Sequence, residues 1–147
     1  SIGIGTGNAY ELVGNRANGI EPGKRPLSSM SPTFVESEKG VLAIGTPGGS
    51  RIISMVMLSI LEYLDPIDVD PSAVVSLARY HHQYLPDRVQ VEPNGFDEAW
   101  IFELRRKGHD VQVYHRKWGN MQAVHCDVSQ TKCSVLNDPR GLAGVVF

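Results

Sequence analysis

The chain has 147 residues, of which 41% are hydrophobic and 20% charged, as expected for one globular domain over residues 1–147. It carries 14 basic and 16 acidic residues, a formal net charge of −2, and no basic stretch that would favour nucleic acid or an anionic membrane. The longest apolar run, around Ile52–Leu61, is interrupted by Ser54 and Ser59 and is too short to span a bilayer.

Residues 1–24 are predicted to form an extended glycine-rich loop. They contain six glycines and no hydrophobic period. The spacing of Gly3, Gly5 and Gly7 resembles a dinucleotide fingerprint, but no strand precedes it and no helical pattern follows, so we reject that interpretation. Ser1 in place of Met indicates a processed, cut or engineered N-terminus, and this end of the chain therefore does not identify the compartment.

A loop rich in proline and serine follows, from Pro22 to Pro32. Its three prolines exclude a helix interior and disfavour a central strand. The adjacent hydroxyls of Ser28 and Ser29 could bind a carboxylate, with basic residues close by in sequence. The alternative is a solvated surface loop, which the composition alone favours.

The next segment predicts a β-hairpin followed by a buried helix. Residues 33–36 and 41–44 read as strands joined by a turn at Glu38–Gly40. The helix from about residue 51 to 64 is apolar on nearly all sides, so we expect it to be buried, with Met55 and Met57 filling the core.

Between this hairpin and this helix lies Gly48-Gly49-Ser50. The two glycines can adopt backbone angles closed to other residues and have no Cβ to keep a ligand away. Ser50 is the expected N-cap of the helix. Two free N–H groups and the positive end of a helix dipole would then meet at one place and bind an anion or oxyanion. The alternative is a tight turn that binds nothing.

The second half of the chain predicts mainly strands. A short helix from Pro71 to about Leu77, capped by Asp70, comes first, and an amphipathic helix from Asp97 to Lys107 ends at Gly108. Residues of alternating polarity predict strands over 89–92, 111–115, 121–126 and 133–136, and residues 137–141 predict a turn. A hairpin, then helices, then more strands indicate an α+β fold.

Two other features leave alternatives open. His81 and His82 are adjacent in an extended segment, so their side chains should point to opposite sides, and hydrogen bonding is favoured over a metal site. Cys126 and Cys133 would face each other if their segment is a hairpin. They would form a disulfide in an oxidising compartment and remain free thiols in a reducing one.

Four stretches in this order resemble one family: residues 22–33, 45–52, 79–87 and 138–141. They are similar to the small, C-terminal subunit of gamma-glutamyltranspeptidases, also called glutathione hydrolases. The resemblance implies an αββα sandwich of the N-terminal nucleophile hydrolase type, made as a precursor that cleaves itself into two subunits. The new N-terminal Thr attacks the gamma-glutamyl amide of glutathione, and the acyl-enzyme passes the glutamyl group to water or an amine.

The resemblance assigns roles to the two motifs above. Gly48 and Gly49 would supply the oxyanion-hole N–H groups, and Ser28 and Ser29 would bind the alpha-carboxylate together with an Arg of the large subunit. We expect no cofactor and no metal, and the resemblance favours a periplasmic or extracellular location.

The chain also departs from the family pattern. It has no Thr-led start, and Ser1 opens a glycine-rich loop rather than a strand, so Ser1 does not fit a nucleophile. We therefore expect a portion of the small subunit, an α+β sandwich lacking its front strands and the nucleophilic Thr. Its partners would be the large subunit and the missing front part, and the isolated chain would tend to self-associate.

Two further functions remain open at this stage. The protein could be a catalytically inactive family member that binds gamma-glutamyl compounds. It could also be a relative acting on poly-gamma-glutamate or on cephalosporin side chains, because residues outside this chain would set that choice.

Overall fold

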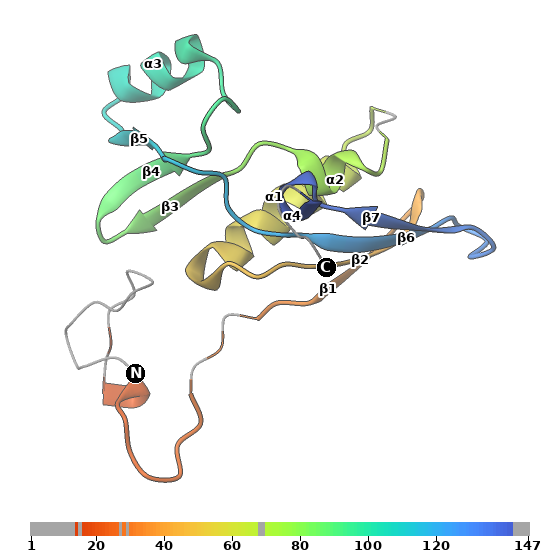
Figure 1. Cartoon of the computed structure of the whole chain (residues 1–147), viewed down its shortest axis with the longest axis horizontal. Helices are drawn as coiled ribbons and strands as arrows, with labels where there is room; N and C mark the ends of the chain where they lie inside the picture. The colour runs from red at the N-terminus through yellow and green to blue at the C-terminus, as the bar shows by residue number, and fades with distance from the viewer. Residues whose placement is uncertain (1–13, 15, 27, 29, 68–69, 143–147) are drawn as a thin grey trace.

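The computed structural model describes residue 14, residues 16–26, residue 28, and residues 30–67 and 70–142 (Figure 1). These residues form two β-sheets with helices packed on them, which confirms the predicted α+β class. The prediction for residues 1–13 lies outside the described residues. Within the predicted N-terminal loop, Arg16–Asn18 form a short 3-10 helix (η1), which the glycine content did not indicate.

The larger sheet has four antiparallel strands in the order β1-β2-β6-β7. They are β1 (Thr33–Ser37), β2 (Gly40–Gly45), β6 (Gln122–Cys126) and β7 (Cys133–Asn137). The alternation of β2 places Leu42 and Ile44 on the core face of the sheet, because successive side chains of a strand point to opposite faces. The predicted hairpin and the later strands are therefore confirmed.

Helix α1 (Ile52–Leu64) lies on the core face of this sheet, and α2 (Ala73–Ser76) packs beside it. The core joins residues of β2, α1, α2 and the loop before β6, among them Leu42, Met55, Val74, Trp118 and Met121. Burial of these side chains supplies the main stabilisation of the fold, at about 1.5–3 kcal/mol for each large apolar residue.

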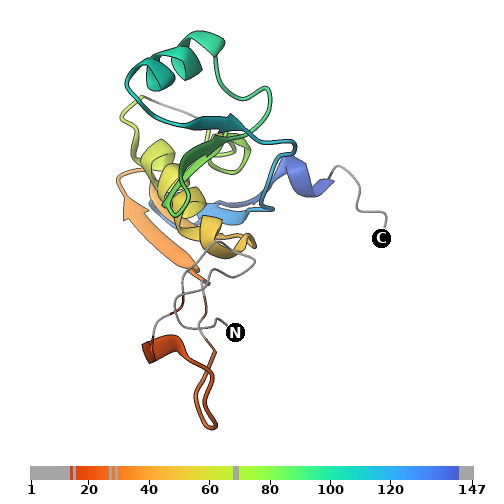
Figure 2. The same ribbon diagram turned by 90° about the vertical axis from the view of Figure 1, so that its left-hand side faces the viewer.

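The smaller sheet has the order β3-β4-β5, with β3 (Tyr80–Tyr84), β4 (Asp87–Val91) and β5 (Val111–Val113). Strands β4 and β5 are parallel, and the connection between them carries α3 (Glu98–Arg106). Both views place α1 between the two sheets (Figures 1 and 2), and α1 contacts β3 directly. The start of α1 is thus within reach of side chains on the smaller sheet.

Helix α3 begins and ends as predicted. The Asp97 carboxylate accepts a hydrogen bond of 3.0 Å from the Ala99 N–H, and Gly108 adopts a φ of 95° just after the helix. Its apolar residues are more exposed than predicted, however, with Phe102 65% exposed. The described residues leave that face of α3 open.

Two predicted helix caps are wrong in detail. A short 3-10 helix, η2 (Gly49–Arg51), precedes α1, so Arg51 is the N-cap of α1 and the Ser50 hydroxyl donates to Gln83 instead. Helix α2 begins at Ala73, and the Asp70 carboxylate accepts from the Ser72 N–H in the turn before it. In both places one turn of tighter backbone comes before the helix proper.

The prediction that α1 is buried on all sides is also wrong. Ile53 is 65% exposed, Leu61 59% and Met57 48%, whereas Met55 is buried as predicted. A pattern of apolar residues predicts that a helix face is buried, but it does not predict which polypeptide packs against that face. The segment after β7, predicted as a turn, contains the four-residue helix α4 (Pro139–Leu142).

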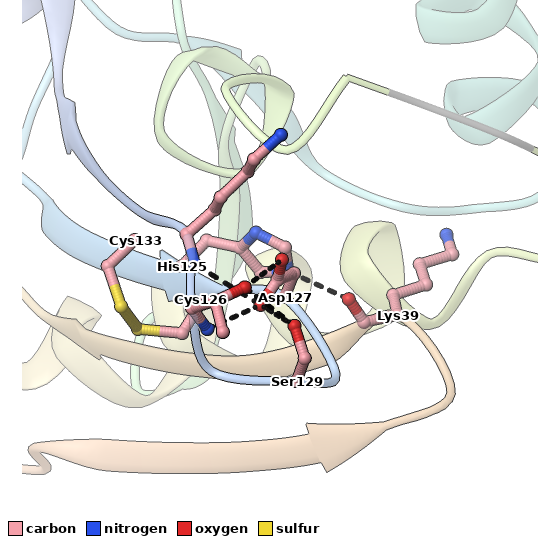
Figure 3. The surroundings of a disulfide bond; sticks show 8 residues. Lys39, His125, Cys126, Asp127, Ser129 and Cys133 are labelled. Carbon is pink, nitrogen blue, oxygen red and sulfur yellow. Dashed lines mark hydrogen bonds between the residues drawn. A yellow bond between two sulfur atoms is a disulfide. The ribbon is translucent and has the colours of Figure 1, made fainter.

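The register of β6 and β7 resolves the state of the cysteines. Cys126 and Cys133 are directly opposite each other in the ladder, and a disulfide joins them (Figure 3). The carboxylate of Asp127 accepts from the Ser129 hydroxyl and from the Thr131 and Lys132 N–H groups, which closes the loop. This end of the sheet is remote from Gly45, where β2 leads into the glycine motif.

Within the described ranges, no helix is long and apolar enough to cross a membrane.

Candidate functional site

Gly48 and Gly49, called the glycine turn below, connect β2 to η2 and α1. Their φ angles are 150° and 59°, a range that L-residues with a Cβ rarely adopt. A Cβ on Gly48 would lie 2.4 Å from Cε of Met55, so the close approach of α1 also requires glycine there.

Among the described residues, the hydrogen bonds of the glycine turn are accepted by its carbonyl groups. The Gly48 carbonyl accepts from the Arg51 N–H at 3.1 Å, but neither glycine N–H donates to any residue in the described part of the chain. Gly48 is exposed and Gly49 is half-buried. Because α1 follows one turn later, its dipole adds positive potential to this pair of donors. The arrangement can bind an anion or a developing oxyanion.

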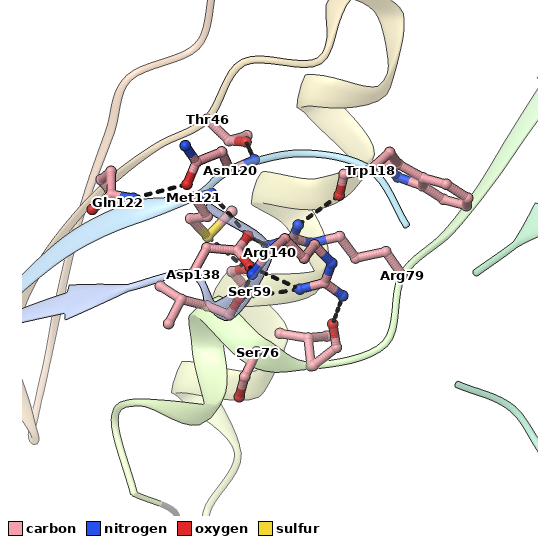
Figure 4. Close-up of polar contacts among 12 residues, drawn as sticks. Thr46, Ser59, Ser76, Arg79, Trp118, Asn120, Met121, Gln122, Asp138 and Arg140 are labelled. Carbon is pink, nitrogen blue, oxygen red and sulfur yellow. Dashed lines mark hydrogen bonds and ion pairs between the residues drawn. The ribbon is translucent and has the colours of Figure 1, made fainter. Parts of the chain in front are cut away.

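The loop at residues 118–120 contacts Thr46 and Met55, the residues next to the glycine turn. The Thr46 hydroxyl oxygen accepts from the Asn120 N–H at 3.2 Å (Figure 4). A Cβ on Gly119 would lie 2.5 Å from Sδ of Met55, the residue that also contacts Gly48. Any shift of this loop would therefore move Met55 or Thr46, and with them the turn.

Four charged residues, Arg79, Glu92, Asp138 and Arg140, form a buried ionic cluster behind this loop. Figure 4 shows three of them, Arg79, Asp138 and Arg140. Arg79 is 0% exposed, pairs with Asp138 at 2.7 Å, and donates to the Trp118 carbonyl at 2.8 Å. Arg140 pairs with both carboxylates, at 3.1 Å from Asp138. The cluster therefore ties β3, β4 and α4 to the loop that supports the turn.

The Asp138 carboxylate is held in its charged form. Burial alone would raise its pKa, but hydrogen bonds from the Met121 and Arg140 N–H groups and from the Arg79 guanidinium outweigh burial and lower the pKa below its usual value. The cluster consequently needs no protonation to remain paired at neutral pH.

The two histidines lie on opposite sides of β3, as predicted. His81 is 5% exposed and bonds to Ser54 and Gln83, whereas the exposed His82 bonds to Asp87 at 2.7 Å. Among the described residues, no group of three His, Cys, Asp or Glu side chains could hold a metal ion.

The other predicted site residues lie on the segment that enters β1. Ser28 is exposed, and its hydroxyl oxygen accepts from the Met30 N–H at 3.2 Å; Ser29 lies outside the described residues. Thr33 of β1 is opposite Ile44 of β2, so Ser28 and the glycine turn belong to the same end of the hairpin. No hydrogen bond between described residues links Ser28 to the turn.

A cavity of about 300 Å³ opens at the same end of the hairpin. It is lined by Ser31 and Thr33 on one side and by apolar residues of α1 on the other, namely Ile53, Val56, Met57, Ile60 and Leu61. Several of these α1 residues belong to the exposed face of the helix described above.

The sequence indicated the glycine turn and the serine pair but not the ionic cluster. Its members are far apart in the chain, and only Asp138 and Arg140 fall in a motif that the sequence singled out together. Arg79 stood beside the two histidines, which drew attention instead. A buried Arg is a signal only once its burial is known.

The fold is α+β, and its strand-to-helix connection at the glycine turn carries two N–H groups that donate to no described residue. The model of the family described as Gamma-glutamyltranspeptidase matches residues 3–146, nearly the whole chain. The chain therefore belongs to the gamma-glutamyltranspeptidase family.

Relatives of known name agree with this assignment. The glutathione hydrolase proenzyme of Escherichia coli is 44% identical over 121 residues, which cover 82% of this chain and 20% of that protein. The chain thus spans about a fifth of the length of that curated relative.

Solved structures give the same result. The gamma-glutamyltranspeptidase of Pseudomonas nitroreducens complexed with L-DON matches with a TM-score of 0.85 and 35% identity, over 100% of this chain and 76% of that chain. The Helicobacter pylori gamma-glutamyltranspeptidase T380A mutant matches with a TM-score of 0.84 and 38% identity, over 95% and 76%. These neighbours confirm the predicted fold of the N-terminal nucleophile hydrolase type.

Proposed function

We propose that this chain is the rear portion of the catalytic small subunit of a gamma-glutamyltransferase or glutathione hydrolase. The observation that carries the proposal is the pair of N–H groups at the glycine turn that donate to no described residue, in a chain whose relatives are named glutathione hydrolases. The reaction is acyl transfer: a Thr hydroxyl of a preceding segment attacks the gamma-glutamyl carbonyl, and the carbonyl oxygen becomes an oxyanion.

Gly48 and Gly49 stabilise that oxyanion in this proposal. Their N–H groups are fixed before the reaction begins, so they reorganise little as charge develops, which is the most effective form of electrostatic stabilisation. Collapse of the tetrahedral intermediate expels the amine and leaves an acyl-enzyme. Water or an acceptor amine then takes the glutamyl group.

Ser28 and Ser29 bind the alpha-carboxylate of the substrate in the same proposal. Ser28 is exposed and belongs to the same end of the hairpin as the glycine turn. Two hydroxyl donors suit a carboxylate, and a cation from another chain would complete its pairing.

The partner in this proposal is the large subunit, together with the front part of the small subunit. The exposed apolar face of α1, with Ile53 65% and Leu61 59% exposed, is the kind of surface that another polypeptide covers. Without that cover the isolated chain should self-associate. The disulfide between Cys126 and Cys133 suits the periplasmic or extracellular location that the family resemblance favours.

The reading frame upstream of Ser1 distinguishes an enzyme from a binding protein that keeps only the pocket. A Thr-led segment there supports the enzyme. An upstream frame without such a Thr would favour a protein that binds gamma-glutamyl compounds without cleaving them.

Turnover tests the role of the glycine turn. The protein, expressed from its full reading frame, is assayed for release of the gamma-glutamyl group from an amide donor. Replacing both glycines (Gly48→Pro with Gly49→Pro) should reduce turnover by at least the ~10²–10³-fold measured for loss of one oxyanion donor. Gly108→Ala controls for the strain of a side chain at positive φ alone, because a Cβ on Gly108 would meet nothing within 4 Å. Turnover that survives the double change would refute the assignment.

A further inference from the structure

Strand β3 carries a row of hydrogen bonds that ends at the residue after Gly49. The Ser50 hydroxyl donates to Oε1 of Gln83 at 3.3 Å, and Nε2 of His81 lies 2.8 Å from the same oxygen. On the other side of the imidazole, Nδ1 of His81 lies 2.7 Å from the Ser54 hydroxyl. We call Ser50, Ser54, His81 and Gln83 the polar row.

The chemistry of the row fixes its direction. A carbonyl oxygen can only accept, so His81 donates from Nε2 to Gln83, and in the neutral imidazole Nδ1 accepts the Ser54 proton. Oε1 of Gln83 therefore accepts two hydrogen bonds, one from the Ser50 hydroxyl in η2 and one from His81 Nε2 in β3. His81 is 5% exposed and the other members are half-buried, so water competes weakly for these bonds.

Arg51, the next residue along, is also held by the smaller sheet. Its Nη2 donates to Oε1 of Gln90 on β4, and its guanidinium lies 5.1 Å from the ring centroid of Tyr114 and 5.2 Å from that of Trp118. Both residues that follow the glycine turn are thus tied to the smaller sheet, while Thr46 before it is tied to Asn120.

These contacts are needed because two successive glycines give the turn no rigidity of their own. Glycine is the residue with the greatest backbone freedom, and two in succession would let their N–H groups wander unless both flanks are fixed. An oxyanion hole works only if its donors are about 2.7–3.1 Å from the position of the developing charge. Anchoring the flanks is therefore part of the function of the turn.

We infer that Gln83, and His81 through Gln83, are positioning residues that hold Ser50 and thereby direct the Gly49 N–H toward the oxyanion. This inference rests on the proposed function of the glycine turn. It gives a role to His81 and Gln83, which the metal and substrate assignments left without one. His82, on the opposite face of β3 and paired with Asp87, has no part in it.

A double-mutant cycle tests the inference in the protein expressed from its full reading frame. Ser50→Ala and Gln83→Leu should each lower kcat about tenfold with KM nearly unchanged, since misplacement of about 1 Å can cost up to ~10²-fold. The double variant should lose no more than either single variant, because both act through one contact. His81→Phe should show a smaller loss. His82→Gln, the matched control, should retain the wild-type rate.

Each other outcome overturns the inference. Additive losses, a rise in KM at constant kcat, or an equal loss in His82→Gln would each show that the polar row does not act through the turn. Ser50→Ala deletes only a hydroxyl, so it keeps the test decisive if Gln83→Leu fails to fold. Activity that is lost in Gly49→Pro but unchanged in Ser50→Ala refutes only this inference. A wild-type protein without gamma-glutamyl transfer activity refutes the proposed function and this inference with it.

Discussion

The glycine turn and the Ser28 segment belong to the same end of the β1–β2 hairpin, yet they are held in opposite ways. The turn is fixed by Met55 and the 118–120 loop below it and by Gln83 beside it. Ser28 is exposed, and within the described residues its hydroxyl serves only its own loop. If the proposed function holds, this contrast means that the chain itself preorganises the donors for the transition state, whereas the binding of the substrate carboxylate by Ser28 depends on further polypeptide.

The largest effect on stability should come from the ionic cluster behind the turn. Asp138→Ala leaves Arg79 buried without its partner, and breaking a buried pair typically costs about 3–5 kcal/mol. The free energy of unfolding, measured by urea denaturation, should fall by this amount, and turnover should fall with it because the supporting loop loosens.

The exposed pair of Arg106 and Glu103 is the control for this change, with side chains 61% and 52% exposed. Glu103→Gln should cost less than about 1 kcal/mol and leave turnover unchanged. A comparable loss of turnover in both variants would show that the buried cluster does not act on the glycine turn.

Ser28→Ala should have a smaller effect, of a different kind. Loss of a hydrogen bond to a carboxylate costs about 1.5–3 kcal/mol, so KM should rise about ten- to a hundredfold while kcat changes little. Steady-state kinetics with an amide donor separate the two constants. If Ser28→Ala lowered kcat at constant KM, Ser28 would act on the transition state as the glycine turn does, and its assignment to substrate binding would be wrong.

Removing the disulfide should separate stability from activity. Cys126→Ser with Cys133→Ser opens a short loop and should cost about 2 kcal/mol, the lower end of the usual range. The bridge lies where Cys126 is opposite Val41, at the far end of β2 from the glycine turn. Thermal unfolding should shift to lower temperature with kcat unchanged, and a loss of kcat would link the two ends of the sheet.

Acid should lower the free energy of unfolding by a modest amount, through the Asp138 carboxylate of the ionic cluster. The pKa of Asp138 is lowered in the folded protein, so this group stabilises the fold above the unfolded pKa of about 3.9 and loses that contribution as the pH falls further. Unfolding free energy should therefore decline below about pH 4. The same titration of Asp138→Asn should decline less steeply, and an unchanged slope would exclude Asp138 as a source.

Local patterns predicted the elements that carry the site. Alternation and a Gly-containing turn gave the hairpin, and Asp97 with Gly108 bounded α3. Tertiary contacts decided the rest. Ser50 has the chemistry of a helix cap but bonds to Gln83 on β3, and the exposure of the apolar residues of α1 depends on what packs against them. The buried ionic cluster joins residues scattered along the chain, so no local window could reveal it.

The sequence predicted the glycine turn of the candidate site, but it did not predict the residues that hold the turn in place. The glycine turn was found because two successive glycines before a helix have a direct physical meaning. Met55, Gly119 and Gln83 act only by contact with that turn, and their types are ordinary for a core, a loop and a strand. Whether two cysteines pair depends on register, which the sequence left open and the β6–β7 ladder fixes.

The most direct test of the central claim is the affinity for a tetrahedral phosphonate analogue of a gamma-glutamyl substrate. Gly49→Pro removes an N–H from the turn and also forces φ toward about −65°, away from the observed 59°, whereas Gly49→Ala keeps the N–H and adds backbone strain of about 1–2 kcal/mol. We expect Gly49→Pro to lose analogue affinity in proportion to its loss in kcat/KM, about 10²-fold or more, and Gly49→Ala to lose much less. Unchanged analogue affinity in Gly49→Pro, with turnover lost, would contradict the claim.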